Sequence, residues 1–250
     1  MSFCKRFFIL LLFSCSLLQQ AKSQDSSRLR ISLLACTPGD ELYSIFGHSA
    51  IRIIDSNSVT DYVYNYGTFD FDDPDFYIKF MRGRLNYFIS LDKTDNFIGF
   101  YQYVNRGIDE QVLDLTEQEK KNIQHQLNEN LKPENRYYKY DFFLDNCTTR
   151  LRDIIRDNKT PNPVLPAVMP ANTTFRDAIH QYLEKGGQYW SELGIDILLG
   201  ARTDRIMTAS QQQFLPDNLM ASLDHCSNLN LVKSKSVLYE AQKNESQTDW

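Results

Sequence analysis

Asp145-Asn146-Cys147-Thr148-Thr149-Arg150 stands where an aromatic segment runs into an amphipathic helix, and the rest of the chain is organised around this junction. Leu151, Ile154 and Ile155 follow at the spacing of one helical face, which predicts an apolar stripe. Cys147 is expected in the first turn, where orphan N–H groups and the helix dipole favour a thiolate. Because the thiolate is the form that attacks carbonyl carbons, Cys147 is a candidate nucleophile. The alternative is a small buried residue, which the polar neighbours disfavour.

A nucleophilic thiol needs a base, and His48 is the strongest candidate among the four histidines. Gly47 before it permits close backbone approach. Apolar residues over 48–54 predict a strand, which would hold the imidazole in place as a general base requires. His125 is expected to be solvated in a polar helix, and His180 to be partly buried in a short one.

A third polar group is expected to orient the imidazole of His48 through its other ring nitrogen. The turn residues at 55–58 predict a hairpin that brings the next strand alongside. Asn65 on that strand is the predicted orienting residue. Asp61 and Tyr64 remain alternatives because the register of the hairpin does not follow from the sequence.

The remaining chain is predicted to mix strands and helices. Further strands are expected at residues 31–36, 85–91 and 110–115, and further helices at residues 74–83, 95–105, 117–131, 173–185 and 190–199. Thr116 and Glu119 have the pattern of a capping box at the start of one helix. Four prolines between residues 161 and 170 predict an irregular connection.

Residues 1–23 have the pattern of a secretory signal peptide. Two basic residues precede an apolar run over 7–18, and residues 21–23 supply a small-x-small cleavage site. The sequence therefore predicts export, with residues 24–220 as one catalytic periplasmic domain and residues 221–250 as a polar tail.

Composition excludes several classes of protein. The 250 residues carry a formal net charge of −5, and the signal segment contains basic but no acidic residues, which argues against nucleic acid as a partner. Beyond that segment nothing approaches the ~18 apolar residues of a spanning helix. The aromatic runs are expected mainly in the core, with a share available for an apolar groove or a lipid interface.

Cofactor motifs are missing from the sequence. There is no Gly-x-Gly-x-x-Gly or phosphate loop, so no nucleotide cofactor is expected. There is also no Cys-x-x-Cys, His-x-x-x-His or His-Glu-x-x-His spacing, so no metal is predicted. After cleavage Cys36, Cys147 and Cys226 would remain, an odd number that leaves at least one free thiol. The sequence leaves open whether Cys36 and Cys226 form a disulfide or are two buried thiols.

Several segments occur in a recognisable order around the Cys147 run. They are Thr37-Pro38-Gly39-Asp40, Phe46-Gly47-His48-Ser49-Ala50-Ile51-Arg52, Tyr64-Asn65-Tyr66-Gly67-Thr68-Phe69-Asp70-Phe71, Arg82-Gly83, Gly200-Ala201-Arg202-Thr203-Asp204 and Phe214-Leu215-Pro216-Asp217. Together they resemble the Lnb N-terminal periplasmic domain family over about residues 30–220.

That resemblance implies a fold and a reaction. The implied fold is α+β and circularly permuted papain-like, as in NlpC/P60 and lecithin:retinol acyltransferase relatives, with an antiparallel sheet packed on helices and extra C-terminal helices. The implied reaction moves an acyl chain from a membrane phospholipid to the N-terminal amine of a lipoprotein. The implied partners are a phospholipid donor, a lipoprotein acceptor and the inner-membrane surface. Longer members carry membrane-spanning segments after this domain.

The resemblance also extends to individual residues. Asn146-Cys147 matches the Asn-Cys pair that opens the nucleophile helix of the acyltransferase relatives. Asn65 matches the position of their third polar residue, where they usually have a histidine. The residues expected to contact substrate are Gly47, Asn146, Thr148 and Tyr64. A cell-wall peptide amidase of the same fold and a non-catalytic module that binds lipid or cell wall are the alternatives.

Overall fold

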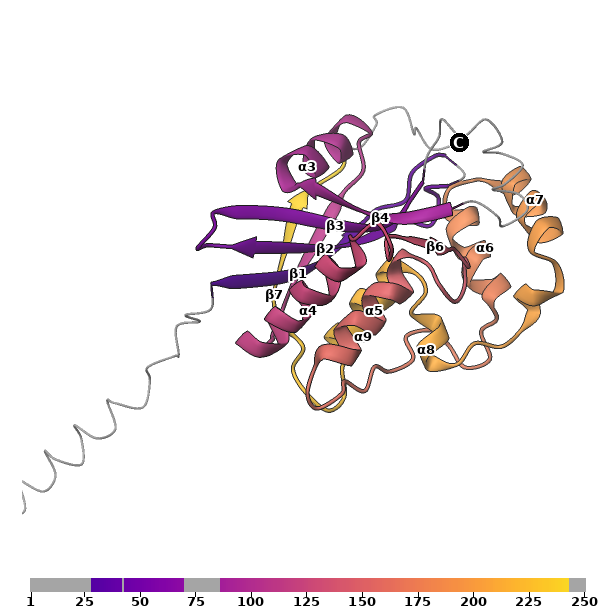
Figure 1. The fold of residues 1–250 in the computed structure, drawn as a ribbon. Helices are drawn as coiled ribbons and strands as arrows, with labels where there is room; N and C mark the ends of the chain where they lie inside the picture. Colours follow the sequence, from indigo (N-terminus) through magenta and orange to yellow (C-terminus); the bar gives the residue numbers. More distant parts are fainter. Residues whose placement is uncertain (1–27, 42, 70–85, 243–250) are drawn as a thin grey trace, which may run out of the picture.

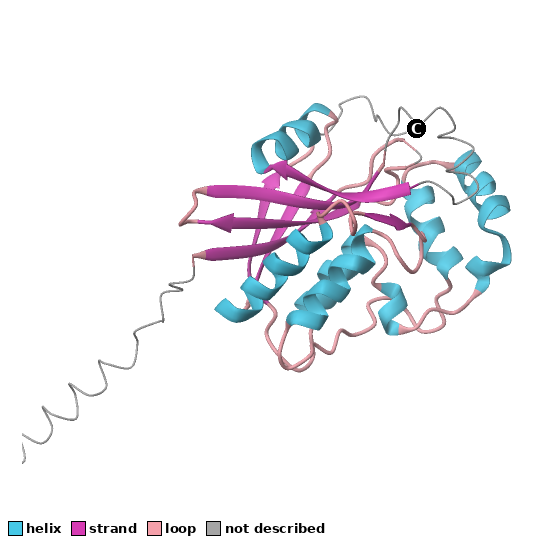
Figure 2. Ribbon diagram, in the orientation of Figure 1, coloured by secondary structure: helices cyan, strands magenta, loops and turns pink. Residues whose placement is uncertain are grey.

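The computed structural model describes residues 28–41, 43–69 and 86–242 (Figure 1). The expected signal peptide and the helix predicted at 74–83 lie outside these residues. Within them the chain combines one antiparallel sheet with helices on both of its faces (Figure 2), which confirms the α+β class.

The sheet has seven strands in the order β6-β4-β3-β2-β1-β5-β7, and every neighbouring pair is antiparallel. The strands are β1 (Leu29–Cys36), β2 (His48–Asp55), β3 (Thr60–Thr68), β4 (Asn86–Lys93), β5 (Ile108–Leu113), β6 (Tyr137–Lys139) and β7 (Val232–Tyr239). In the central strands, β1 is buried at every residue but one and β2 at five of its eight residues, because helices cover both faces of the sheet there.

Eight helical segments follow or interrupt the strands in the described residues. They are α3 (Thr94–Tyr103), α4 (Glu117–Asn130), α5 (Cys147–Asn158), α6 (Phe175–Lys185), α7 (Tyr189–Leu199), the 3-10 helix η2 (Gly200–Asp204), α8 (Ala209–Gln212) and α9 (Pro216–Asp224). The capping box predicted for α4 is present: Thr116 accepts from the N–H of Glu119, and Glu119 accepts from that of Thr116. None of the helices in this part of the chain has the length and apolar character needed to cross a membrane.

Three clusters of buried apolar residues hold the helices against the sheet and against one another. The largest joins one face of the sheet to α4, α5 and α9, with Ile51 and Leu151 among its fully buried members (Figure 1). A second joins the opposite face to α3 through Phe97 and Tyr101. A third lies beside the sheet, where α6 and α7 pack around an aromatic group that includes Phe214. The predicted apolar stripe of α5 therefore faces the main core.

The C-terminal segment differs from its prediction as a polar tail over 221–250. Residues Val232–Tyr239 form β7, which pairs with β5 at one edge of the sheet. Its Lys233, Lys235 and Ser236 are exposed, so the composition resembles that of a tail although the backbone is paired with β5. Lysine is common on edge strands because its charge discourages pairing with another chain.

Candidate active site

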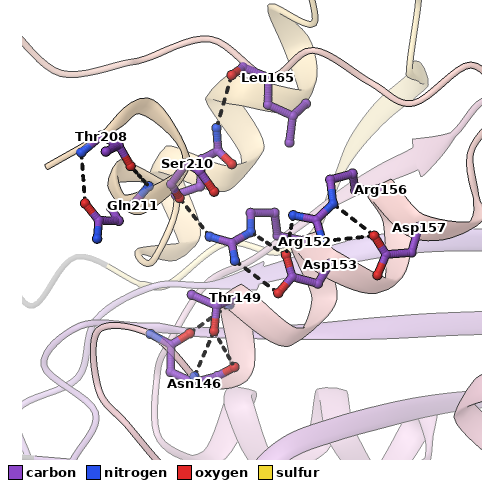
Figure 3. Close-up of polar contacts among 11 residues, drawn as sticks. Asn146, Thr149, Arg152, Asp153, Arg156, Asp157, Leu165, Thr208, Ser210 and Gln211 are labelled. Carbon is purple, nitrogen blue, oxygen red and sulfur yellow. Dashed lines mark hydrogen bonds and ion pairs between the residues drawn. The ribbon is translucent and has the colours of Figure 1, made fainter.

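The start of α5 is fixed by side-chain hydrogen bonds (Figure 3). The Asn146 side chain accepts the N–H of Thr149 at 2.8 Å, and the Thr149 hydroxyl accepts the N–H of Asn146 at 2.8 Å. The Asn146 amide also donates to the carbonyls of Phe142 and Phe214 at 2.8 and 2.9 Å. This buried asparagine, predicted to contact substrate, instead uses its side chain to hold the backbone that precedes Cys147.

Cys147 is the first residue of α5, as predicted, and the groups around its thiol lower the pKa of the thiol. Burial raises the pKa of the thiol, but the charge of His48 and its hydrogen bond, the N–H of Ser49 and the hydroxyl of Thr148 lower it more. The net result is a pKa of about 7, below the ordinary 9.0. By contrast, burial raises the pKa of Cys36 to about 12. Cys147 is thus poised to be a thiolate near neutral pH.

His48 opens β2 and is oriented by Asn65 on β3. Its Nε2 lies 3.3 Å from Oδ1 of Asn65, while the Asn65 amide donates to Asp92 at 2.8 Å. A carboxylate only accepts hydrogen bonds, so the amide nitrogen must face Asp92 and the amide oxygen must face the ring. His48 therefore carries its proton on Nε2, and the Nδ1 lone pair is left for the thiol of Cys147.

The hairpin geometry resolves the alternatives that the sequence left open. Asp61 forms an ion pair with Arg52 and accepts from Thr94, so it is committed elsewhere. Tyr64 lies on the other face of β3 from Asn65 and donates to Asn128 on α4 at 2.8 Å. Asn65 is therefore the residue that lies beside His48. Tyr64 was expected to contact substrate, but the structure does not place it at the site.

Asp92 extends the hydrogen-bonded series and was missed by the sequence reasoning. It also accepts from the hydroxyl of Ser90, which in turn bonds to Thr68. The β3–β4 register shifts between Asn65 and Thr68. Asp92 lies before this shift, two residues from Ser90, which is the partner of Asn65. The pairing of two strands that are distant in the sequence cannot be inferred from alternation of residue types, so Asp92 gave no recognisable signal.

Two glycines allow the chain to approach this site. Gly47 has φ +75°, and a Cβ there would lie 2.7 Å from the carbonyl oxygen of Cys36. Gly47 therefore allows the backbone before His48 to pass close to the end of β1, in agreement with the close approach predicted from the sequence. Gly67, with φ +83°, lies at the register shift, and a Cβ there would be 3.6 Å from that of Cys147.

Thr148 joins α5 to the strand that carries the base. Its hydroxyl is buried, lies 3.0 Å from that of Ser49 on β2, and is 3.8 Å from the sulfur of Cys147. This places Thr148, which was expected to contact substrate, beside the thiol. Because both hydroxyls are buried, the pair fixes the distance between the helix and the strand.

Tyrosines form an aromatic wall beside the thiol. Tyr87 and Tyr140 stack with ring centroids 4.2 Å apart, and Arg150 lies 3.6 Å above the ring of Tyr138. Burial and the charge of Cys147 raise the pKa of Tyr87 to about 12, and the same two causes raise those of Tyr138 and Tyr140. The phenols stay neutral, so they supply an apolar surface next to a charged sulfur. The aromatic run before Cys147 was the available signal.

The three cysteines in the described part of the chain are free thiols. Cys36 is buried at the end of β1, and Cys226 is partly exposed after α9. The two do not form the disulfide that the sequence left open. Cys147 thus differs from the other two in combining partial exposure with a neighbouring imidazole.

Comparison with known proteins gives one match. The family model described as the Lnb N-terminal periplasmic domain matches residues 18–181, which include His48, Asn65, Asp92 and Cys147. Neither a curated protein nor a solved structure matches significantly. Since the match covers well over half of the sequence, the chain belongs to the Lnb N-terminal periplasmic domain family.

Proposed function

We propose that this protein is an exported cysteine acyltransferase. It takes an acyl chain from a phospholipid as a thioester on Cys147 and passes it to the N-terminal amine of a lipoprotein. The observation that carries the proposal is the series Cys147, His48, Asn65 and Asp92, in which the imidazole lowers the pKa of the thiol to about 7. A periplasmic family agrees with an acyl donor and acceptor outside the cytoplasm.

In the first half-reaction the thiolate of Cys147 attacks the ester carbonyl. The N–H of Thr149 is held by Asn146, but those of Cys147 and Thr148, which have no partner inside the helix, are suited to hold the oxyanion. When the tetrahedral intermediate collapses, the ester C–O bond breaks. His48, protonated in the ion pair, gives its Nδ1 proton to the departing oxygen, and a lysophospholipid leaves.

In the second half-reaction the lipoprotein amine attacks the thioester. His48 accepts a proton from the attacking nitrogen at Nδ1, the C–S bond breaks, and the thiolate of Cys147 is restored with an amide as product. Asn65 keeps the ring in one orientation through both steps, because the Nε2 proton stays in its hydrogen bond. Asp92 holds the amide of Asn65 in turn.

The exposed side of α7 suits a substrate that lies in a membrane. Trp190 and Ile197 are 87% and 76% exposed, and Tyr189 and Leu193 are exposed beside them. Trp and Tyr favour the lipid interface because their rings are apolar but carry a polar group. We propose this apolar side of α7 (residues 189, 190, 193 and 197) as the surface that meets the phospholipid bilayer.

The α6–α7 pair adjoins the end of the sheet where His48 begins β2. Phe46, two residues before the histidine, lies against Tyr182 of α6 with ring centroids 6.1 Å apart. Phe46 also packs on Phe142, whose carbonyl holds the side chain of Asn146. A membrane held by α7 would therefore lie near the elements that carry the thiol and its base.

Reconstitution tests the proposal. The purified protein is incubated with phospholipid vesicles and a synthetic lipopeptide that has a free N-terminal amine, and the N-acylated product is measured by mass spectrometry. The wild type and Cys226→Ala are expected to form product and lysophospholipid, and Cys147→Ala to form neither. Equal product from Cys147→Ala would contradict the role of the thiol. Release of peptides from peptidoglycan, with no acyl transfer, would favour the amidase alternative.

A further inference from the structure

A histidine and two glutamates gather between α6 and α7, outside the Cys147 site. They are His180 and Glu184 on α6 and Glu192 on α7, and one ligand atom of each lies within 4.8 Å of the other two. His180 and Glu184 are four residues apart, so they lie on the same side of α6. We propose that this cluster binds one divalent transition-metal ion, for which Zn²⁺ is the reference, and that the ion clasps α7 to α6.

The imidazole of His180 is already oriented as a metal ligand. Its Nε2 lies 3.0 Å from Asp196, which leaves Nδ1 facing Glu192. Asp196 is also paired with Arg176, so its charge is neutralised and it serves as a hydrogen-bond acceptor for the ring. Metal-binding histidines generally donate their second ring nitrogen to a carboxylate in this way, because that bond fixes the ring and its tautomer.

The carboxylate of Glu192 is poorly satisfied by the protein groups around it. Its Oε1 lies 3.6 Å from Nδ1 of His180, which is too long for a hydrogen bond. Its Oε2 is buried and has no hydrogen-bond partner within the described residues. Even with a proton on Nδ1 of His180, neither carboxylate oxygen of Glu192 would have a short hydrogen bond to the ring. A cation between the three side chains would be bound by Nδ1 and by this carboxylate at once.

The donor set favours zinc over the alkaline-earth ions. One imidazole nitrogen and two carboxylates suit Zn²⁺, with water as a fourth ligand, whereas Ca²⁺ and Mg²⁺ prefer oxygen donors alone. Tetrahedral ligands at about 2.0–2.1 Å from zinc are about 3.4 Å from one another. The 3.6 Å between Nδ1 and Oε1 is close to that spacing. Glu184 is exposed, which gives the ion a way in.

Zinc titration of the full chain tests the site separately from acyl transfer. The measurements use a Cys147→Ala background, because the thiolate is itself a zinc ligand, and chelator-treated protein. Calorimetry is expected to find one bound zinc per chain. Glu184→Gln should weaken the affinity at least about tenfold, since it removes a ligand from an exposed position where folding is not at risk. His125→Gln, a matched change of an exposed histidine on α4, should not.

Thermal unfolding supplies a second measurement. Zinc should raise the Tm of the background protein and of His125→Gln, because an ion that binds the folded chain stabilises it. The same addition should raise the Tm of Glu184→Gln and Glu192→Gln by clearly less, because their affinity for zinc is lower. The proposal is overturned if the background protein binds no zinc at about 100 μM, or if both glutamine variants bind it as tightly as the background does.

Discussion

Replacing His48 by alanine tests the activation of Cys147 most sharply. The imidazole supplies the main interactions that lower the pKa of the thiol, and burial, which raises it, would remain. The pKa should therefore move from about 7 to at least its ordinary 9.0. The thiolate exists above the pKa, so at pH 7 the ionised fraction should fall from about one half to about 1%.

The alkylation rate should fall by less than this fraction. A thiolate of higher pKa is intrinsically more nucleophilic, by about tenfold or slightly less for two pKa units. The roughly 50-fold loss of thiolate combined with this gain leaves a net decrease of about five- to eightfold at pH 7. The midpoint of the pH profile, which should shift upward by two units or more, is the more decisive quantity.

Iodoacetamide labelling across pH 5–10, read by peptide mass spectrometry at Cys147, provides the assay. Rates at Cys226 in the same samples control for the reagent, and His125→Ala controls for loss of a histidine elsewhere. A midpoint for His48→Ala that stays within half a unit of 7 would refute the account of the ion pair.

Three other predictions concern orientation, backbone and membrane contact. Asn65→Ala should lower acyl transfer at least about tenfold without changing the midpoint of Cys147 much, because about one hydrogen bond to the ring is lost; unchanged turnover would contradict its role. Gly47→Ala should destabilise the fold by about 1–3 kcal/mol in urea unfolding, since φ +75° and the Cys36 carbonyl exclude a side chain. Gly99→Ala, in an exposed helical position with open space around it, should not. Trp190→Ser with Ile197→Ser should reduce vesicle cosedimentation severalfold and leave Cys147 alkylation unchanged, whereas equal binding would exclude this surface.

The elements that carry the proposed chemistry were predictable because their signals are local. The polar run around Cys147 and the stripe through Leu151 and Ile155 place Cys147 at a helix start without reference to the rest of the fold. The turn after β2 brings a second strand alongside, so Asn65 could be proposed as the partner of His48. A helix start and a short hairpin depend on neighbours in the sequence.

Features that depend on distant pairing were missed. Asp92 reaches Asn65 because β4 pairs with β3 so that Ser90 lies opposite Asn65 and Asp92 lies two residues farther along the same face. The strand β7 was taken for a tail because most of its residues face solvent at the sheet edge. The cluster proposed to bind zinc has no motif in the sequence, because Glu192 lies on a different helix from His180 and Glu184. In each case the missing information is which segments lie together in space.

The central claim is that Cys147 carries the acyl chain, and intact-protein mass spectrometry tests it directly. After incubation with phospholipid vesicles and no acceptor, the mass of the wild type should increase by that of one acyl group less one hydrogen, because the acyl group replaces the thiol hydrogen. The adduct should map to Cys147, be removed by neutral hydroxylamine as thioesters are, and disappear when a lipopeptide amine is added. An unmodified wild-type chain that nevertheless produces N-acylated lipopeptide, or an adduct that persists in Cys147→Ala, would contradict the account.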